Sequence, residues 1–166
     1  MKLLLLALFT TSVFAGTTAP IMPDDGLYTY FSSTQYPNPK LTPGVARQVT
    51  QYNLCTTSTK LVRHTSADTK KQVYAEYGLK PTFGDSCTGP SHSCYEVNHL
   101  IPLEDGGADV KENLWPQKYD GINNAHDKDK LENFLHKQIC ANKITMEAAQ
   151  TCIAKDWIAC KKAQMK

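Results

Sequence analysis

The sequence predicts one α+β domain stapled by disulfides, in which a short β-hairpin is followed by two helices. Three observations support this prediction. Residues 95–103 alternate apolar and polar side chains in the manner of a half-buried strand. Two later segments, residues 126–140 and 145–160, repeat apolar residues at helical spacing. Six cysteines in a chain of 166 residues are typical of a small domain held together by disulfides.

The N-terminal segment is predicted to be a secretory signal peptide. Residues 1–15 (MKLLLLALFTTSVFA) place one lysine before an apolar run and end on a small residue, Ala15. The run is too short to cross a hydrocarbon core of about 30 Å, so we expect a secreted, extracellular protein that does not associate with a membrane. Residues 16–45 are rich in Thr, Ser and Pro and are expected to form an extended arm. Residues 46–166 suffice for one domain with its own core, which we expect to be monomeric.

All six cysteines follow the predicted cleavage site, and an even number in a secreted chain predicts three disulfides. A structural zinc site is the alternative, but no two cysteines have the CxxC spacing typical of zinc ligands. Cys152 and Cys160 would be separated by about 12 Å along an unbroken helix, which is too far for a bridge. They could instead pair with Cys87 and Cys94, although counting alone leaves the connectivity open.

Before the hairpin, the sequence predicts a short strand and a helix. The strand is expected around residues 61–62, where β-prone side chains meet. The helix is expected over residues 68–77, with Gly78 as its stop. Residues 81–93 are rich in Gly, Ser and Pro and are expected to form a loop.

The hairpin has a long connection between its strands. Gly106 and Gly107 interrupt the alternating pattern, and a second short strand is expected over residues 113–115, ending at Pro116. The first strand is expected to place five side chains on one face, namely Tyr95, Val97, His99, Ile101 and Leu103.

Two helices are predicted to complete the domain. The first begins near His126 and places Leu131, Leu135 and Ile139 on one face. The second has Thr145 as its N-cap and buries a stripe made of Met146, Ala149, Ile153, Trp157 and Cys160.

Polar side chains of the hairpin and the following helix are the candidates for chemistry. His99 lies near the end of the first strand, and an imidazole with a pKa of about 6.5 can act as a general base. Asn113 opens the second strand, and His126 starts the helix. Asn98 and His126 can offer an oxygen and a nitrogen to a metal ion. Taken singly, His99 also fits a core histidine, Asn113 a turn residue and His126 an ordinary residue at a helix start.

These residues carry a resemblance to a known family. The segments NHLIPLEDGG, ENLWPQ and AHDKDKLEN resemble the HNH-type core of the His-metal-finger (ββα-metal) endonucleases, in which Asp or His precedes His, Asn follows about fourteen residues later, and a helix bears His or Asn. The flanking segments NLCTTSTKLVR and ITMEAAQTCIAKDW resemble those of small secreted relatives, so the likeness covers roughly residues 50–160. It suggests a disulfide between Cys55 and Cys140.

The resemblance also implies roles for the candidate residues. His99 would be the general base that activates water, and Asn113 would brace the loop and orient this base. His126 and Asn98 would be ligands of one divalent cation, commonly magnesium, with manganese or zinc as alternatives. In-line attack on phosphorus would leave a 3′-hydroxyl and a 5′-phosphate.

Two positions depart from the family pattern. Asn98 stands where Asp or His is usual, and a neutral amide is a poorer ligand for a hard cation. The alternatives to a nuclease are therefore a catalytically impaired, secreted nucleic-acid-binding protein of the same fold and a disulfide-rich interaction protein. The spacing from Asn113 to His126 is longer than in compact motifs, so the helix ligand could instead be Asn123, Asn124 or Asp127.

The charge distribution suits a nucleic-acid substrate, although the formal net charge is only +2. Residues 81–127 carry two basic and eight acidic groups, whereas residues 47–80 carry six and two, and residues 128–166 carry eight and four. An acidic centre that could hold a cation thus lies between basic segments that could contact phosphates, although solvated helix faces give the same counts. Because no base-reading motif is present, we expect DNA and/or RNA to be bound through phosphates with low sequence specificity.

Overall fold

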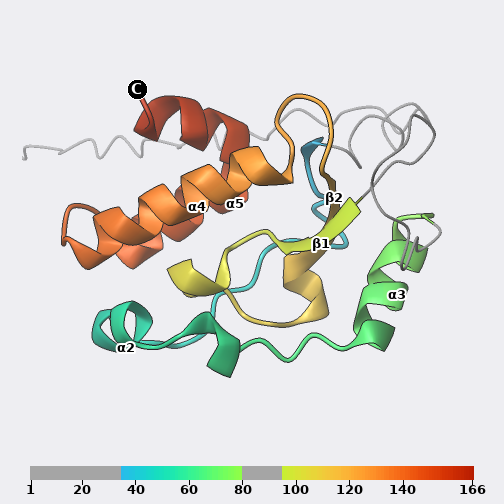
Figure 1. Cartoon of the computed structure of the whole chain (residues 1–166), viewed down its shortest axis with the longest axis horizontal. Coiled ribbons are helices and arrows are strands. Elements are labelled where there is room, and N and C mark those ends of the chain that lie inside the picture. Colours follow the sequence, from blue (N-terminus) through green and yellow to red (C-terminus); the bar gives the residue numbers. More distant parts are fainter. Residues whose placement is uncertain (1–34, 80–94) are drawn as a thin grey trace, which may run out of the picture.

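The computed structural model describes residues 35–79 and 95–166 (Figure 1). Within these ranges the chain is α+β, as predicted, and no helix is long and apolar enough to cross a membrane. The predicted signal peptide, the arm before residue 35, the loop at 81–93, and Cys87 and Cys94 lie outside the described residues. The described elements are α2 (Gln51–Thr56), the 3-10 helix η1 (Thr59–Leu61), α3 (Ala67–Glu76), β1 (Tyr95–His99), the 3-10 helices η2 (Leu103–Asp105) and η3 (Lys111–Asn113), β2 (Leu114–Lys118), α4 (Ala125–Cys140) and α5 (Met146–Gln164).

The two strands form an antiparallel hairpin in which His99 pairs with Leu114. The first strand ends at His99 rather than at Leu103, because the backbone N–H and carbonyl of Ile101 bond to the side chain of Asn113. The expected end of the second strand at Pro116 is wrong, since Pro116 lies inside β2 opposite Val97. Each strand of a two-stranded sheet has one side without a partner, and proline is tolerated where its nitrogen faces that side.

The segment before the hairpin is helical. Ser66 caps α3 by accepting a hydrogen bond from the N–H of Thr69, and Gly78 follows the helix with a φ of 66°, so the predicted helix and its stop are confirmed. The predicted strand at residues 61–62 is wrong. The side chain of Ser58 instead caps η1 by accepting from the Lys60 N–H, which starts a helical turn.

The hydrophobic core lies between α4 and α5, which run side by side in Figure 1. Both predicted helices are confirmed: Asn124 caps α4 and Thr145 caps α5 through their side-chain oxygens. Each fully buried aliphatic side chain contributes about 1.5–3 kcal/mol, so this helix pair supplies much of the stability. Its fully or almost fully buried members are Leu131, Leu135, Ile139, Ile153 and Trp157.

The described part of the arm is fastened to this core. The indole Nε1 of Trp157 donates to the carbonyl of Gln35 at 2.6 Å. Thr42 is buried, and its hydroxyl donates to the carbonyl of Leu114 at 2.7 Å. Residues 35–45 thus pack against α5 and the hairpin.

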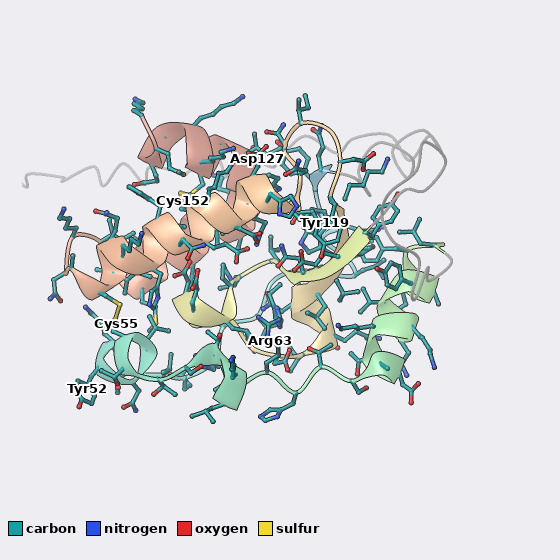
Figure 2. The ribbon with its side chains drawn as sticks, in the orientation of Figure 1. Tyr52, Cys55, Arg63, Tyr119, Asp127 and Cys152 are labelled. Atoms are coloured by element: carbon teal, nitrogen blue, oxygen red, sulfur yellow. A yellow bond between two sulfur atoms is a disulfide. The ribbon has the colours of Figure 1, made fainter. Side chains whose placement is uncertain are left out.

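Two disulfides join described residues, and one of them corrects a prediction. Cys55 bonds to Cys140, as the resemblance suggested, and so ties α2 to the end of α4 (Figure 2). Cys152 bonds to Cys160 with a Cα–Cα distance of 5.4 Å, so the expectation that this pair is too far apart is wrong. The reason is a kink in α5 at Asp156, whose φ of -164° and ψ of 94° are not helical. Its carboxylate accepts from the N–H of Ala159 and so restarts the helix.

Candidate functional site

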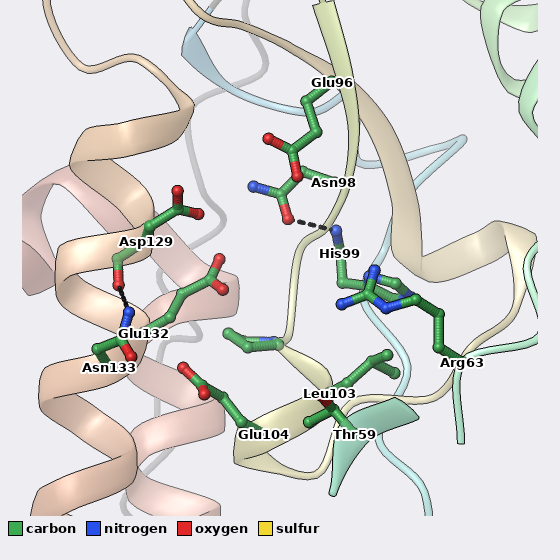
Figure 3. A pocket seen from close by; sticks show the side chains of 11 residues that line it. Thr59, Arg63, Glu96, Asn98, His99, Leu103, Glu104, Asp129, Glu132 and Asn133 are labelled. Carbon is green, nitrogen blue, oxygen red and sulfur yellow. Dashed lines mark hydrogen bonds between the residues drawn. The ribbon is translucent and has the colours of Figure 1, made fainter. Parts of the chain in front are cut away.

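A cavity of about 240 Å³ lies beside the end of β1 and is lined mainly by polar side chains (Figure 3). Asn98 and His99 of β1 stand between its two sides. Figure 3 shows α4 on one side and Arg63, which follows η1, on the other. The lining residues are Thr59, Arg63, Glu96, Asn98, His99, Pro102, Leu103, Glu104, Asp129, Glu132 and Asn133.

His99 is held in a fixed orientation by Asp109. Its Nε2 lies 2.7 Å from Oδ1 of Asp109, and the two side chains are only 4% and 6% exposed. Asp109 also accepts hydrogen bonds from the backbone N–H of His64 and the hydroxyl of Thr65. Burial alone would raise the pKa of Asp109, but the bonds from Thr65, His64 and His99 outweigh it and hold the pKa at about 2.

The ionised Asp109 determines the protonation pattern of the His99 ring. A carboxylate can only accept hydrogen bonds, so Nε2 must carry the proton and Nδ1 keeps its lone pair. Burial lowers the pKa of His99; Asp109 opposes this effect, and the positive charges of Arg63 and Lys128 add to it. The imidazole is therefore neutral at physiological pH and can accept a proton at Nδ1.

Asn113 fastens the connection between the strands. It is fully buried, and its Oδ1 accepts from the N–H groups of Ile101 at 3.0 Å and Val45 at 3.3 Å. Its Nδ2 donates to the carbonyls of Ile101 and Ala108, both at 2.9 Å. These bonds take the backbone groups of Ile101 out of the strand pattern, which explains why β1 ends early.

Gly107 passes close to this brace. A Cβ atom there would lie 1.8 Å from the carbonyl oxygen of Ile101 and 2.9 Å from Nδ2 of Asn113. Only glycine therefore fits at Gly107, whereas Gly106 is required by its left-handed backbone with a φ of 89°.

Asn98 lies at the cavity, but its amide already has partners. Its Oδ1 accepts from the backbone N–H of His99 at 2.8 Å, the bond dashed in Figure 3, and its Nδ2 donates to Oε1 of Gln117 at 3.0 Å. The oxygen keeps one further lone pair. Asn98 thus fixes the backbone at the N–H of His99 and has limited capacity left to bind a metal ion in the cavity.

The structure does not bring His126 to the cavity. Its side chain is 65% exposed, its Nδ1 lies 3.7 Å from Oδ2 of Asp129, and its ring stacks at a tilt on Tyr119 with centroids 5.3 Å apart. His126 precedes Asp129 by three residues, one helical turn beyond the end of the cavity.

The three alternative helix ligands lie outside the cavity as well. Asn123 has a φ of 54° in the turn before α4. Asn124 caps α4 by accepting from the N–H of Asp127 at 3.0 Å. Asp127 is ion-paired with Lys130 and Lys161.

Four carboxyl groups do line the cavity, from Glu96, Glu104, Asp129 and Glu132. Burial raises the pKa of both Glu96 and Glu104, and the charges of Asp129 and Glu132 raise it further. This side of the cavity therefore has a surplus of negative charge. Among residues 35–79 and 95–166, however, no group of three or more His, Cys, Asp or Glu side chains is placed to hold a metal ion.

Lys128 lies beneath this side of the cavity and is fully buried. Its Nζ donates to the carbonyl of His99 at 2.7 Å and is ion-paired with Glu132. The ammonium thus joins α4 to the backbone of His99, and its own charge is fully shielded from solvent, whereas the Glu132 side chain is 14% exposed.

Sequence reasoning missed Asp109 and the cavity-lining face of α4. The i, i+3 spacing of Asp129 and Glu132 was a usable signal, because it places both carboxylates on one helix face. Asp109 lies in an irregular connection, where no periodicity marks it.

The fold and the cavity together define an α+β protein with a carboxylate-lined cavity around a buried, neutral histidine. No family model matches the chain, and comparisons with curated proteins and with solved structures give no match either.

Proposed function

We propose that this chain is a secreted, metal-dependent endonuclease that hydrolyses phosphodiester bonds of DNA and/or RNA with His99 as general base. One observation carries the proposal: His99, kept neutral and oriented by Asp109, lines a cavity that has carboxylates on one side and Arg63 on the other. This arrangement provides a proton acceptor, oxygen ligands for a cation and a positive charge for a phosphate group.

The residues at the cavity fit a magnesium ion better than zinc. Asp129 and Glu132, with the remaining lone pair of Asn98, would hold it, because carboxylate and amide oxygens suit a hard cation. Magnesium commonly keeps several waters and uses one or two protein carboxylates plus substrate oxygens, so it needs no group of three protein ligands. When bound, the ion neutralises charge that develops on the phosphate and the leaving oxygen. Manganese can use the same ligands.

The protein side chains supply the proton transfer and its geometry. Nδ1 of His99 takes a proton from the attacking water, while Asp109 retains the proton on Nε2 and stabilises the imidazolium that forms. Lys128 and Asn113 hold the backbone at and just after His99, through the carbonyl of His99 and the N–H of Ile101. Phosphate contacts alone carry no base information, so the proposal includes low sequence specificity.

Digestion of plasmid DNA and of RNA tests this function. The oxidised protein starting at Gly16 is assayed with magnesium, manganese or EDTA, beside His99→Ala and the exposed-residue control Tyr52→Ala. We expect metal-dependent cleavage by the wild type and by the control, and a loss of about 10²- to 10⁴-fold in His99→Ala. Equal cleavage by His99→Ala of native circular dichroism would refute the role of His99.

The alternative function is nucleic-acid binding without cleavage. Two observations favour it: the amide of Asn98 is already engaged, and the described residues lack a preformed group of three metal-binding side chains. A folded wild-type protein that binds DNA or RNA in EDTA and cleaves neither with any metal would establish this alternative.

A further inference from the structure

Arg63 differs from the other cation beside the cavity. Lys128 is buried, and its charge is already paired with Glu132. The guanidinium of Arg63, by contrast, makes no hydrogen bond or ion pair with the described part of the chain, although it shares the cavity with four carboxylates. A guanidinium has five N–H donors in a fixed planar fork, so an unpaired one is available to bind an anion.

The backbone after Arg63 is anchored through the two residues that follow it. The N–H of His64 and the hydroxyl of Thr65 both donate to the carboxylate of Asp109. The same carboxylate accepts from Nε2 of His99. One side chain thus sets both the backbone next to Arg63 and the ring of the base. Figure 3 shows the guanidinium beside the imidazole and opposite α4.

We propose that Arg63 binds the non-bridging oxygens of the substrate phosphate and that Asp109 is the positioning residue that holds Arg63 in register with His99. This inference rests on the proposed function and deepens it by naming the phosphate anchor. A planar guanidinium can donate two parallel hydrogen bonds to two phosphate oxygens, which a lysine ammonium cannot do in the same geometry.

The carboxylates on the opposite side of the cavity affect how strongly Arg63 would bind an anion. Glu96, Glu104, Asp129 and Glu132 would repel a free anion from Arg63. A divalent ion held by these carboxylates would neutralise their charge and so weaken this repulsion. We therefore expect the contribution of Arg63 to nucleic-acid binding to be larger with magnesium than with EDTA.

The first test measures binding of a fluorescein-labelled DNA duplex by the full mature chain over a series of salt concentrations with magnesium. All proteins carry His99→Gln, because this amide can still donate to Asp109 but cannot take up a proton. Arg63→Ala, Arg63→Lys and the neighbouring exposed control Lys60→Ala are compared with this parent.

We expect Arg63→Ala to weaken binding about tenfold to a hundredfold and to reduce the salt slope by about one. Arg63→Lys should keep the slope but lose affinity, and Lys60→Ala should resemble the parent. Unchanged affinity and slope in Arg63→Ala, or a parent that binds no DNA, would overturn the proposal. If wild type cleaves and Arg63→Ala cleaves equally well, only this inference fails and the proposed function stands.

The second test concerns Asp109. Asp109→Asn is made with and without Arg63→Ala in the same parent, with native circular dichroism required of each protein. If Asp109 acts on binding through Arg63, Asp109→Asn weakens binding several-fold when Arg63 is present and has no effect once Arg63 is alanine. An equal effect in both backgrounds would show that Asp109 does not position Arg63.

Discussion

At the scale of single residues, the buried carboxyl group of Asp105 is unusual. Its side chain is fully buried, and neither carboxyl oxygen has a hydrogen-bond partner within the described residues. Nδ1 of His136 lies 3.8 Å from Oδ1 of Asp105, but it is hydrogen-bonded instead to the carbonyl of Glu104 at 2.7 Å. Burial, with the charges of Glu104 and Glu132, raises the pKa of Asp105 to about 8, and Lys128 only partly opposes this. Asp105 is therefore a neutral acid in the folded protein at pH 7.

This residue predicts a pH dependence of stability. In the unfolded chain the carboxyl ionises near its ordinary pKa of 3.8, so the contribution of Asp105 to stability is most favourable below that pH. This contribution to the free energy of unfolding is lost progressively as the pH rises to about 8, by an amount on the order of several kcal/mol. Urea unfolding of wild type and Asp105→Asn at intervals between about pH 5 and 8 measures it. The variant lacks the ionisation, so its stability should gain on that of wild type as the pH rises. Parallel profiles would contradict the prediction.

Some residues of the candidate site are marked by a local sequence pattern, and only these could be predicted. His99 and Asn113 lie at strand ends, and the alternating pattern and family resemblance identified both positions. The role of Asp109 could not be predicted from the sequence, because it depends on a loop of residues 62–66 folding against the hairpin. The exposed position of His126 could not be predicted either, because it depends on where the cavity ends along α4.

At the scale of elements, α3, α4 and α5 were predictable, whereas α2 and the irregularities of the helices were not. The Gly78 stop after α3, the apolar stripes of α4 and α5, and the Thr145 cap are local signals, and they were sufficient to predict these three helices. The kink at Asp156 has no such signal, since an aspartate inside a helix usually lies on its solvated face. The second strand was wrongly predicted to end at Pro116, because a strand tolerates proline on the side that has no partner strand, and the sequence does not show which side that is.

The two described disulfides should differ in their contribution to stability. Cys55–Cys140 closes a loop with a sequence separation of 85, whereas Cys152–Cys160 closes one with a separation of 8. Loop-closure entropy predicts about 4.5 kcal/mol for the first and about 2.5 kcal/mol for the second. Urea unfolding of the paired variants Cys55→Ser/Cys140→Ser and Cys152→Ser/Cys160→Ser checks this order. A larger loss in the second variant would show that the kinked helix depends on its bridge for more than chain entropy.

At the scale of the whole molecule, the cavity is assembled from segments far apart in sequence. Thr59 and Arg63 come from one side, Glu96 to Glu104 from the hairpin, and Asp129 to Asn133 from α4. The bridge from Cys55 to Cys140 joins the first of these regions to the last. Because disulfides persist in oxidising compartments, this architecture agrees with the proposed secretion.

The amide of Asn113 ties the irregular connection between the strands to the rest of the fold, which should slow its hydrogen exchange to that of a core element. Its four bonds reach Val45, Ile101 and Ala108. The N–H of Ile101 can then meet deuterium only when the hairpin, the arm and the connection separate together. We expect its exchange, followed by NMR in D₂O, to be as slow as that of Leu135 in the core. Fast exchange at Ile101 would mean that the connection opens alone.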